Sequence, residues 1–106
     1  MTFSREFYRI GGLVAALEAN GIEATTAQIR HYDDKFNDHF PFNPKLSQSG
    51  QRMYSRKQAE AIYKLLKINK DKTLLTIDGL RAVAAGKLKE ELELIKKEVV
   101  PLDTDN

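Results

Sequence analysis

The chain contains no cysteine, which excludes a disulfide framework, a thiolate metal site and a redox-active thiol. No apolar run approaches the roughly 20 residues needed to cross a bilayer, and the N-terminus lacks the apolar segment of a signal peptide. We therefore expect no membrane partner and a cytoplasmic location. With 106 residues, 42% of them hydrophobic, the chain is sized for one compact core rather than two.

A large excess of charge of one sign is also missing, because 17 Lys and Arg residues are nearly balanced by 15 Asp and Glu residues. The distribution along the chain is less even. Residues 45–72 hold eight basic residues against only Glu60 and Asp71, a net charge of +6, so the rest of the chain carries −4. Total charge gives no argument for a nucleic-acid partner, whereas this basic segment does.

The groups needed for catalysis are absent as well. No nucleophile, base and orienting group come together along the chain, and there is no glycine-rich phosphate loop. Asp33 and Asp34 are neighbours on an expected helix, where adjacent side chains point apart. His31 and His39 have no third ligand at a spacing suited to a metal. We expect neither an enzyme nor a cofactor or metal site.

The N-terminal part predicts a helix of about ten residues. Leu13, Val14 and Leu17 recur at the three-to-four spacing of an amphipathic helix that begins near Gly11. Gly21 ends it, because glycine readily takes the left-handed conformation that follows a helix. So short a helix is too weak to stand alone and is expected to pack on another element.

A second helix is expected to start at Thr25 or Thr26, whose hydroxyl can cap its first turn. Ile29 and Tyr32 fall on one side of it. The remaining long polar side chains project elsewhere, and they are Gln28, Arg30 and His31. Two short helices joined by a glycine-containing turn form a helix-turn-helix pattern, in which the second helix lies in the major groove of DNA.

The segment that follows predicts a small β-hairpin. Pro41 and Pro44 prevent a continuous helix. Beyond them, Leu46 and Met53 are expected to point inward, with residues 47–51 as the loop. A basic, polar hairpin beside a helix-turn-helix is a wing, whose tip can lie along phosphates or in a minor groove.

Two further helices are expected after the hairpin. Ser55 and Gln58 form a capping box that opens a helix reaching about Asn69. Its buried stripe consists of Ala59, Ile62, Leu65 and Leu66. Thr76 opens the next helix, which ends at Gly86. Its core-facing residues are Ile77, Leu80, Val83 and Ala84.

The last helix is expected from Lys87 to about Val100, with a coiled-coil seam of about two heptads. The seam consists of Leu88, Leu92, Ile95 and Val99. So short a seam either folds back on the domain or pairs weakly with a second copy to form a homodimer. We therefore divide the chain into a first domain, residues 1–86, and a short C-terminal helix with an acidic tail, residues 87–106.

Two motifs in this order resemble the DNA-binding domain of MerR-type regulators. The first is Gln-Ile-Arg-His-Tyr-Asp at residues 28–33, and the second is Gly-Gln-Arg-Met-Tyr-Ser at residues 50–55. The resemblance covers roughly Tyr8 to Gly86. It implies a mainly α, winged helix-turn-helix fold with a small β-hairpin wing. Members of the family read operators as dimers, with the second helix in the major groove and the wing against the backbone.

Carried onto this chain, the resemblance implies that Arg30 and Tyr32 touch DNA from the second helix, and Arg52 and Tyr54 from the end of the wing. Gln28 is a candidate base reader, because an amide can pair bidentately with adenine. Further phosphate contacts are expected. The full set expected at DNA is Thr25, Thr26, Gln28, Arg30, His31, Tyr32, Lys45, Gln48, Gln51, Arg52, Tyr54, Arg56 and Lys57.

The sequence departs from the family pattern in three places. His31 stands where Tyr or Phe is usual, and the turn of residues 21–26 is about two residues longer than the common form. The long dimerisation helix and effector domain of full-length members have no counterpart here. We expect a small transcriptional regulator. The alternatives are an architectural factor of the excisionase or phage DNA-packaging kind, and a protein-interaction module that works through the Leu88–Val99 seam.

Overall fold

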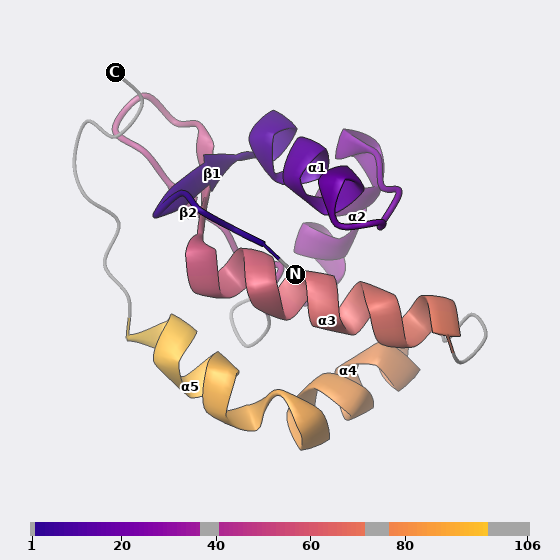
Figure 1. Cartoon of the computed structure of the whole chain (residues 1–106). Coiled ribbons are helices and arrows are strands. Elements are labelled where there is room, and N and C mark those ends of the chain that lie inside the picture. Colours follow the sequence, from indigo (N-terminus) through magenta and orange to yellow (C-terminus); the bar gives the residue numbers. More distant parts are fainter. Residues whose placement is uncertain (1, 37–40, 72–76, 98–106) are drawn as a thin grey trace.

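The computed structural model describes residues 2–36, 41–71 and 77–97, which are mainly helical with one small sheet (Figure 1). The order of elements along the chain is β1 (Phe7–Arg9), α1 (Ile10–Ala19), α2 (Thr26–Phe36), β2 (Lys45–Leu46), β3 (Arg52–Ser55), α3 (Arg56–Asp71), α4 (Ile77–Lys87) and α5 (Lys89–Lys96). Helix α3 runs through the middle of the molecule, with α1 and α2 on one side and α4 and α5 on the other.

The sheet is antiparallel and has the order β1-β3-β2, so β3 is central. Strands β2 and β3 form the expected hairpin, with Lys45 opposite Met53. Strand β1 was not expected from the sequence. It pairs with β3 so that Tyr8 lies opposite Tyr54, and both rings are buried. A strand of three residues is too short to show a periodic pattern in the sequence. It is recognised only through its backbone pairing with β3.

The expectation that Leu46 and Met53 both point inward is wrong for Leu46. Met53 is buried, whereas the Leu46 side chain is 65% exposed. The register explains the difference, because Leu46 lies opposite Arg52 rather than Met53. Successive residues of a strand point to opposite faces, so Leu46 and Met53 cannot share one.

Both N-terminal helices begin near the expected residues, and α1 also ends where expected. Helix α1 ends before Asn20, and Gly21 has a φ of +86°, the left-handed conformation that a helix end favours. Helix α2 begins with a capping box. The Thr25 hydroxyl accepts a hydrogen bond from the Gln28 backbone N–H at 3.1 Å, and the Gln28 side-chain oxygen accepts one from the Thr25 N–H at 2.9 Å.

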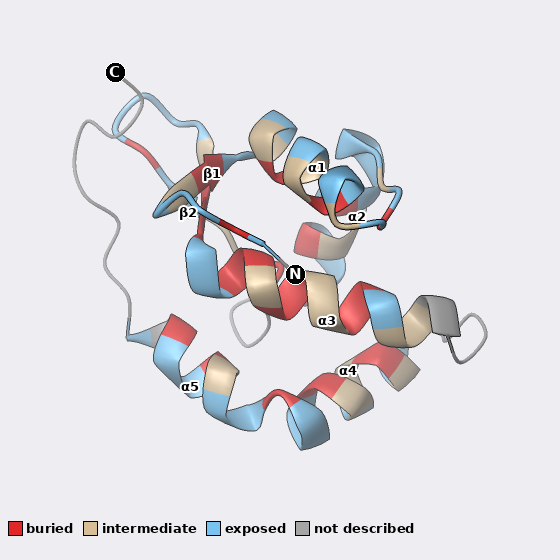
Figure 2. Ribbon diagram, in the orientation of Figure 1, coloured by how far each residue is buried: buried red, intermediate tan, exposed pale blue. Residues whose placement is uncertain are grey.

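Helix α3 supplies the central part of the hydrophobic core. The expected stripe of Ala59, Ile62, Leu65 and Leu66 is buried throughout (Figure 2). The helix opens with the expected capping box between Ser55 and Gln58, at 3.0 and 3.1 Å. It runs to Asp71, two residues past the expected end.

Helix α4 ends at Lys87, one residue past the expected stop at Gly86. Leu80 and Ala84 are buried and Val83 is half-buried, as expected, while Thr76 lies outside the described residues. Helix α4 also contacts α2, because the Arg81 guanidinium donates to the Lys35 carbonyl in the last turn of α2.

Helix α5 folds back on the chain. Leu88, Leu92 and Ile95 are buried in the same hydrophobic core as the residues of α1 and α3. An ion pair of 3.0 Å between Lys64 and Glu91 links α3 to α5. The short C-terminal helix after residue 86 therefore shares the one expected core.

The burial of Leu88, Leu92 and Ile95 fits the alternative in which the seam folds back on the domain, and pairing with a second copy stays a prediction. These three side chains already have apolar partners within the chain. The fourth seam residue, Val99, lies outside the described residues. No helix in the described part of the chain is both long and apolar enough to span a membrane.

We expect Leu92→Ala to lower the free energy of unfolding by about 2–3 kcal/mol, because it removes buried methyl groups and leaves a cavity. Leu94 lies on the same helix and is 48% exposed, so Leu94→Ala is the matched control, with an expected change within about 0.5 kcal/mol. Urea denaturation measures both. Equal stabilities for the two variants, with a fall in sedimentation mass for Leu92→Ala, would instead show a seam between copies.

Candidate nucleic-acid interface

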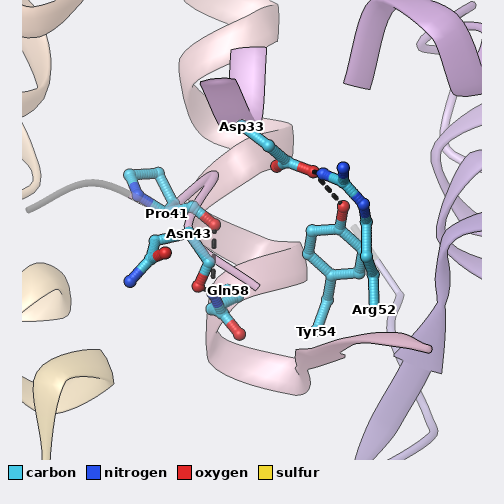
Figure 3. A network of polar contacts seen from close by, with 6 residues as sticks. All are labelled: Asp33, Pro41, Asn43, Arg52, Tyr54 and Gln58. Atoms are coloured by element: carbon cyan, nitrogen blue, oxygen red, sulfur yellow. Dashed lines mark hydrogen bonds and ion pairs between the residues drawn. The ribbon is translucent and has the colours of Figure 1, made fainter. Parts of the chain in front are cut away.

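The two stretches that carry the family resemblance meet at Asp33. Ile29, Asp33 and Phe36 form the buried side of α2 at the helical spacing of four and three residues. Asp33 Oδ2 accepts a hydrogen bond from the Tyr54 hydroxyl and another from a terminal guanidinium nitrogen of Arg52, each at 2.6 Å (Figure 3). One carboxylate oxygen thus joins α2 to two residues of β3.

The Asp33 side chain is only 3% exposed, and this burial raises the pKa of its carboxyl to about 6. The hydrogen bonds from Tyr54 and Arg52 act in the opposite direction, since they favour the charged form. Asp33 Oδ1 is buried and has no hydrogen-bond partner. The pKa of the Tyr54 hydroxyl is also raised, mainly because the group is buried and next because it lies beside Asp33. The hydroxyl therefore keeps its proton and remains a hydrogen-bond donor.

Tyr54 does not have the position that a DNA contact requires. Its side chain is completely buried, and its hydroxyl donates to Asp33. The expected contact between Tyr54 and DNA is therefore corrected to a structural link between β3 and α2. Arg52 differs, because its side chain is 33% exposed and only one of its nitrogens is bonded to Asp33. A phosphate contact from Arg52 stays a prediction.

The outer side of α2 carries the other expected residues. Thr25, Thr26, Gln28, Arg30 and His31 are all exposed. The Gln28 amide, however, already completes the helix cap through its oxygen. Bidentate pairing with adenine uses both ends of the amide, so Gln28 would have to leave the cap to read a base.

Tyr32 occupies an intermediate position at the edge of this surface. Its ring packs at 4.8 Å from that of Phe42 and at 6.0 Å from that of Phe36, measured between centroids. The neighbouring His31 ring lies 6.1 Å away. Tyr32 is half-buried, which fits an aromatic side chain that anchors a helix and still shows one edge to solvent.

The wing, which we define as β2, β3 and residues 47–51 between them, presents three of the expected polar residues. Lys45, Gln48 and Gln51 are exposed. The loop between the strands is ordered by Ser47, whose N–H donates to the Gln51 carbonyl at 2.8 Å and whose hydroxyl accepts from the Gln51 N–H at 3.1 Å. Gly50 takes a φ of +85°, which favours glycine at that position.

The start of α3 fixes the base of the wing. The Gln58 side-chain nitrogen donates to the carbonyls of Pro41 and Asn43, at 3.2 and 2.7 Å, while its oxygen caps the helix (Figure 3). Gln58 is buried, so all of these bonds form away from solvent. The segment that leads into β2 is therefore held to α3.

Arg56 and Lys57, both expected at phosphates, are exposed at the start of α3. The Arg56 guanidinium is occupied within the chain, because it donates to the carbonyls of Ser4 and Arg5 at 2.9 and 3.1 Å. Arg56 thus holds the N-terminal segment, and its expected phosphate contact stays a prediction. Lys57 remains a candidate phosphate contact.

Two residues of this site make tertiary contacts that the sequence did not predict. Apart from its place in the first motif, Asp33 is weighed above only as half of a carboxylate pair with Asp34, yet its carboxylate pairs with Arg52. Its spacing of four and three from Ile29 and Phe36 was the available signal for burial. Gln58 was recognised as a cap, but its contacts with Pro41 and Asn43 depend on tertiary packing and have no sequence signal.

Comparisons with known proteins supply no relative for this site. No family model, no curated protein and no solved structure matches the chain. Among the described residues, no three His, Cys, Asp or Glu side chains come together in a way that could hold a metal ion.

We expect the Asp33 carboxyl to reduce stability as the pH rises from about 4 to about 6. Its folded-state pKa of about 6 lies above the ordinary aspartate pKa of 3.8, so between these values the folded chain binds more protons than the unfolded chain. Stability therefore falls with rising pH across this window. Asp33→Asn should flatten that part of the profile, as measured by urea denaturation at a series of pH values.

The matched control is Asp34→Asn, because Asp34 is exposed and adjacent. In Asp34→Asn, stability should still fall with rising pH at the same slope, and the pH window of the fall should shift only slightly. The reason is that the Asp34 charge contributes only a minor part of the raised Asp33 pKa. Glu91 acts in the opposite direction, because its hydrogen bond to Lys64 lowers its pKa, so each variant is compared with the wild type. An unchanged slope in Asp33→Asn would show that another group titrates in this window.

Proposed function

We propose that this chain is a sequence-specific, double-stranded DNA-binding protein, a small transcriptional regulator built on a MerR-type winged helix-turn-helix. One observation carries the proposal. The Asp33 carboxylate holds α2 against β3 through Arg52 and Tyr54, so the two motifs that resemble the family are held together in space. A helix alone would be ordinary, whereas a helix and a wing held together form a two-part DNA-binding surface.

In this proposal α2 enters the major groove with its exposed side. Arg30 is the principal base reader, because a guanidinium can pair bidentately with the O6 and N7 atoms of guanine. Arg30 is exposed, and Asp33, one turn further along the helix, is engaged by Arg52. His31, Thr25 and Thr26 lie on the same exposed part of α2 and would contact flanking bases or phosphates.

The wing would lie along the DNA backbone. Lys45 and Arg52 supply positive charge, and Gln48 and Gln51 supply amide donors near the loop. Such contacts add affinity without sequence information, and they make binding depend on salt concentration. Because α2 and the wing are already linked through Asp33, little ordering free energy would be lost on binding.

The fold-back of α5 favours a second candidate function. The apolar residues expected to form a dimer seam are buried within the chain, so the described residues present no helix of the kind that pairs MerR-type subunits. A chain that binds as single copies at repeated sites would suit an architectural factor of the excisionase or DNA-packaging kind. A footprint on one palindromic site supports the regulator, and phased repeats with DNA bending support the architectural factor.

We expect Arg30→Ala to weaken binding to a selected DNA site by about tenfold or more and to relax the preference at one base pair. The site is first obtained by selecting bound duplexes from random DNA, and dissociation constants are then measured at several salt concentrations. The matched control is Lys89→Ala, an exposed basic residue of α5 on the far side of α3, which should leave the affinity unchanged.

Two results would count against this proposal. A wild-type chain that enriches no duplex and shows no salt-dependent binding would favour a protein-interaction module instead. Equal losses in Arg30→Ala and Lys89→Ala would mean that only total positive charge matters, and sequence-specific reading by α2 would be wrong.

A further inference from the structure

Leu46 is an apolar side chain in a polar, basic neighbourhood. It is 65% exposed, and Leu94 on α5 is the other large hydrophobic residue that is exposed in the described part of the chain. Single exposed leucines are common on protein surfaces, so exposure alone carries little weight. The location of Leu46 within the wing carries the argument.

The sheet register places Leu46 on the side that faces α2. Leu46 lies directly opposite Arg52, and residues directly opposite each other in an antiparallel pair share a face. Arg52 and Tyr54 project from that face, and both reach Asp33 of α2. Leu46 is therefore on the side of the sheet that faces α2, the proposed reading helix. Unlike Tyr54 on the same side, Leu46 is not part of the buried core.

The wing holds Leu46 in place without burying it. The bonds between Ser47 and Gln51, at 2.8 and 3.1 Å, close the loop directly after Leu46, and the Gly50 N–H donates to the Ser47 carbonyl at 2.9 Å. Ser47 itself is buried, so the order of the loop comes from the backbone and Ser47. Leu46, which is 65% exposed, contributes little to the fold, while the loop that follows it is ordered.

The surroundings of Leu46 indicate the chemistry of that partner. Arg52 lies across from it on the same face of the sheet, while the exposed Lys45 precedes it in β2 and, paired with Met53, belongs to the opposite face. A surface with an apolar centre and cationic neighbours complements the wall of a DNA minor groove, where the C–H faces of deoxyribose lie between phosphates. Apolar side chains are a recurrent means of contact in this groove.

Resting on the DNA binding proposed above, we propose that Leu46 packs against deoxyribose in the minor groove when the wing meets DNA. The contact adds affinity and responds to the width of the groove, but it makes no hydrogen bond to a base. Arg52 supplies a phosphate contact beside it on the same face, and Lys45 supplies one from the opposite face of the wing. A partner protein or a second copy would require a larger apolar surface than one leucine provides.

Leu46→Thr tests the contact, because threonine favours strands and keeps the wing while removing most of the apolar surface. We expect the dissociation constant for the selected duplex to rise roughly tenfold, since most of a leucine side chain is buried in the complex. The slope of log affinity against log salt should stay the same, because no phosphate contact is lost. Lys45→Ala should instead reduce that slope.

Two controls isolate the side chain from the fold. Leu94→Thr makes the same change at an exposed leucine of α5 and should leave affinity unchanged. Leu46→Met keeps an apolar side chain and should retain most of the wild-type affinity. Thermal melting of Leu46→Thr should match the wild type closely, because the residue is exposed.

Equal affinity for Leu46→Thr and wild type would overturn the proposal while leaving DNA binding by α2 intact. A changed salt slope in Leu46→Thr would overturn it too, since the loss would then come from displaced phosphate contacts. A drop in sedimentation mass for Leu46→Thr would assign Leu46 to contact between copies. Failure of the wild type to bind any duplex removes both this proposal and the proposed function.

Discussion

The buried Asp33 carboxylate is the interaction on which the relation between α2 and the wing depends. Moving a carboxyl group out of water is costly, and here hydrogen bonds from Tyr54 and Arg52 at 2.6 Å offset part of the cost, so the pKa of Asp33 stays raised. Replacing such a group by an apolar one is often neutral for stability, so its main effect is geometric. Because one oxygen accepts from two residues of β3, α2 cannot turn about its axis without breaking a buried bond.

A second constraint acts through repeated helix caps. Helices α2 and α3 both open with a hydroxyl residue followed three residues later by Gln, but the two glutamines are used differently. Gln28 is exposed and completes only its own cap, whereas Gln58 is buried and also bonds the carbonyls of Pro41 and Asn43. The same local motif therefore only caps the helix at the start of α2, whereas at the start of α3 it also links the helix to a distant segment. Burial decides which of the two results.

Much of this fold could be predicted from interactions between residues that are close together in the sequence. The Thr25 cap, the Ser55–Gln58 capping box, the left-handed Gly21 and the stripe of α3 each depend on residues within one or two turns, and all were confirmed. What the sequence could not reveal depends on pairing between distant segments. Strand β1 exists only because Tyr8 meets Tyr54, and the register of β2 on β3 places Leu46 on the opposite face from the buried Met53. The direction of the α5 seam likewise depended on whether α3 and α4 had an apolar face left to cover.

The same constraints bear on how the wing could act on DNA. Its base is fixed by Gln58, its centre by Asp33 and its loop by Ser47, so an exposed two-residue strand keeps its shape without a core beneath it. A rigid wing loses little conformational freedom on binding, which leaves more of its contact energy for affinity. It also cannot adapt to a groove of the wrong width. A wing built in this way would therefore discriminate between DNA sites by their shape even where none of its side chains reads a base.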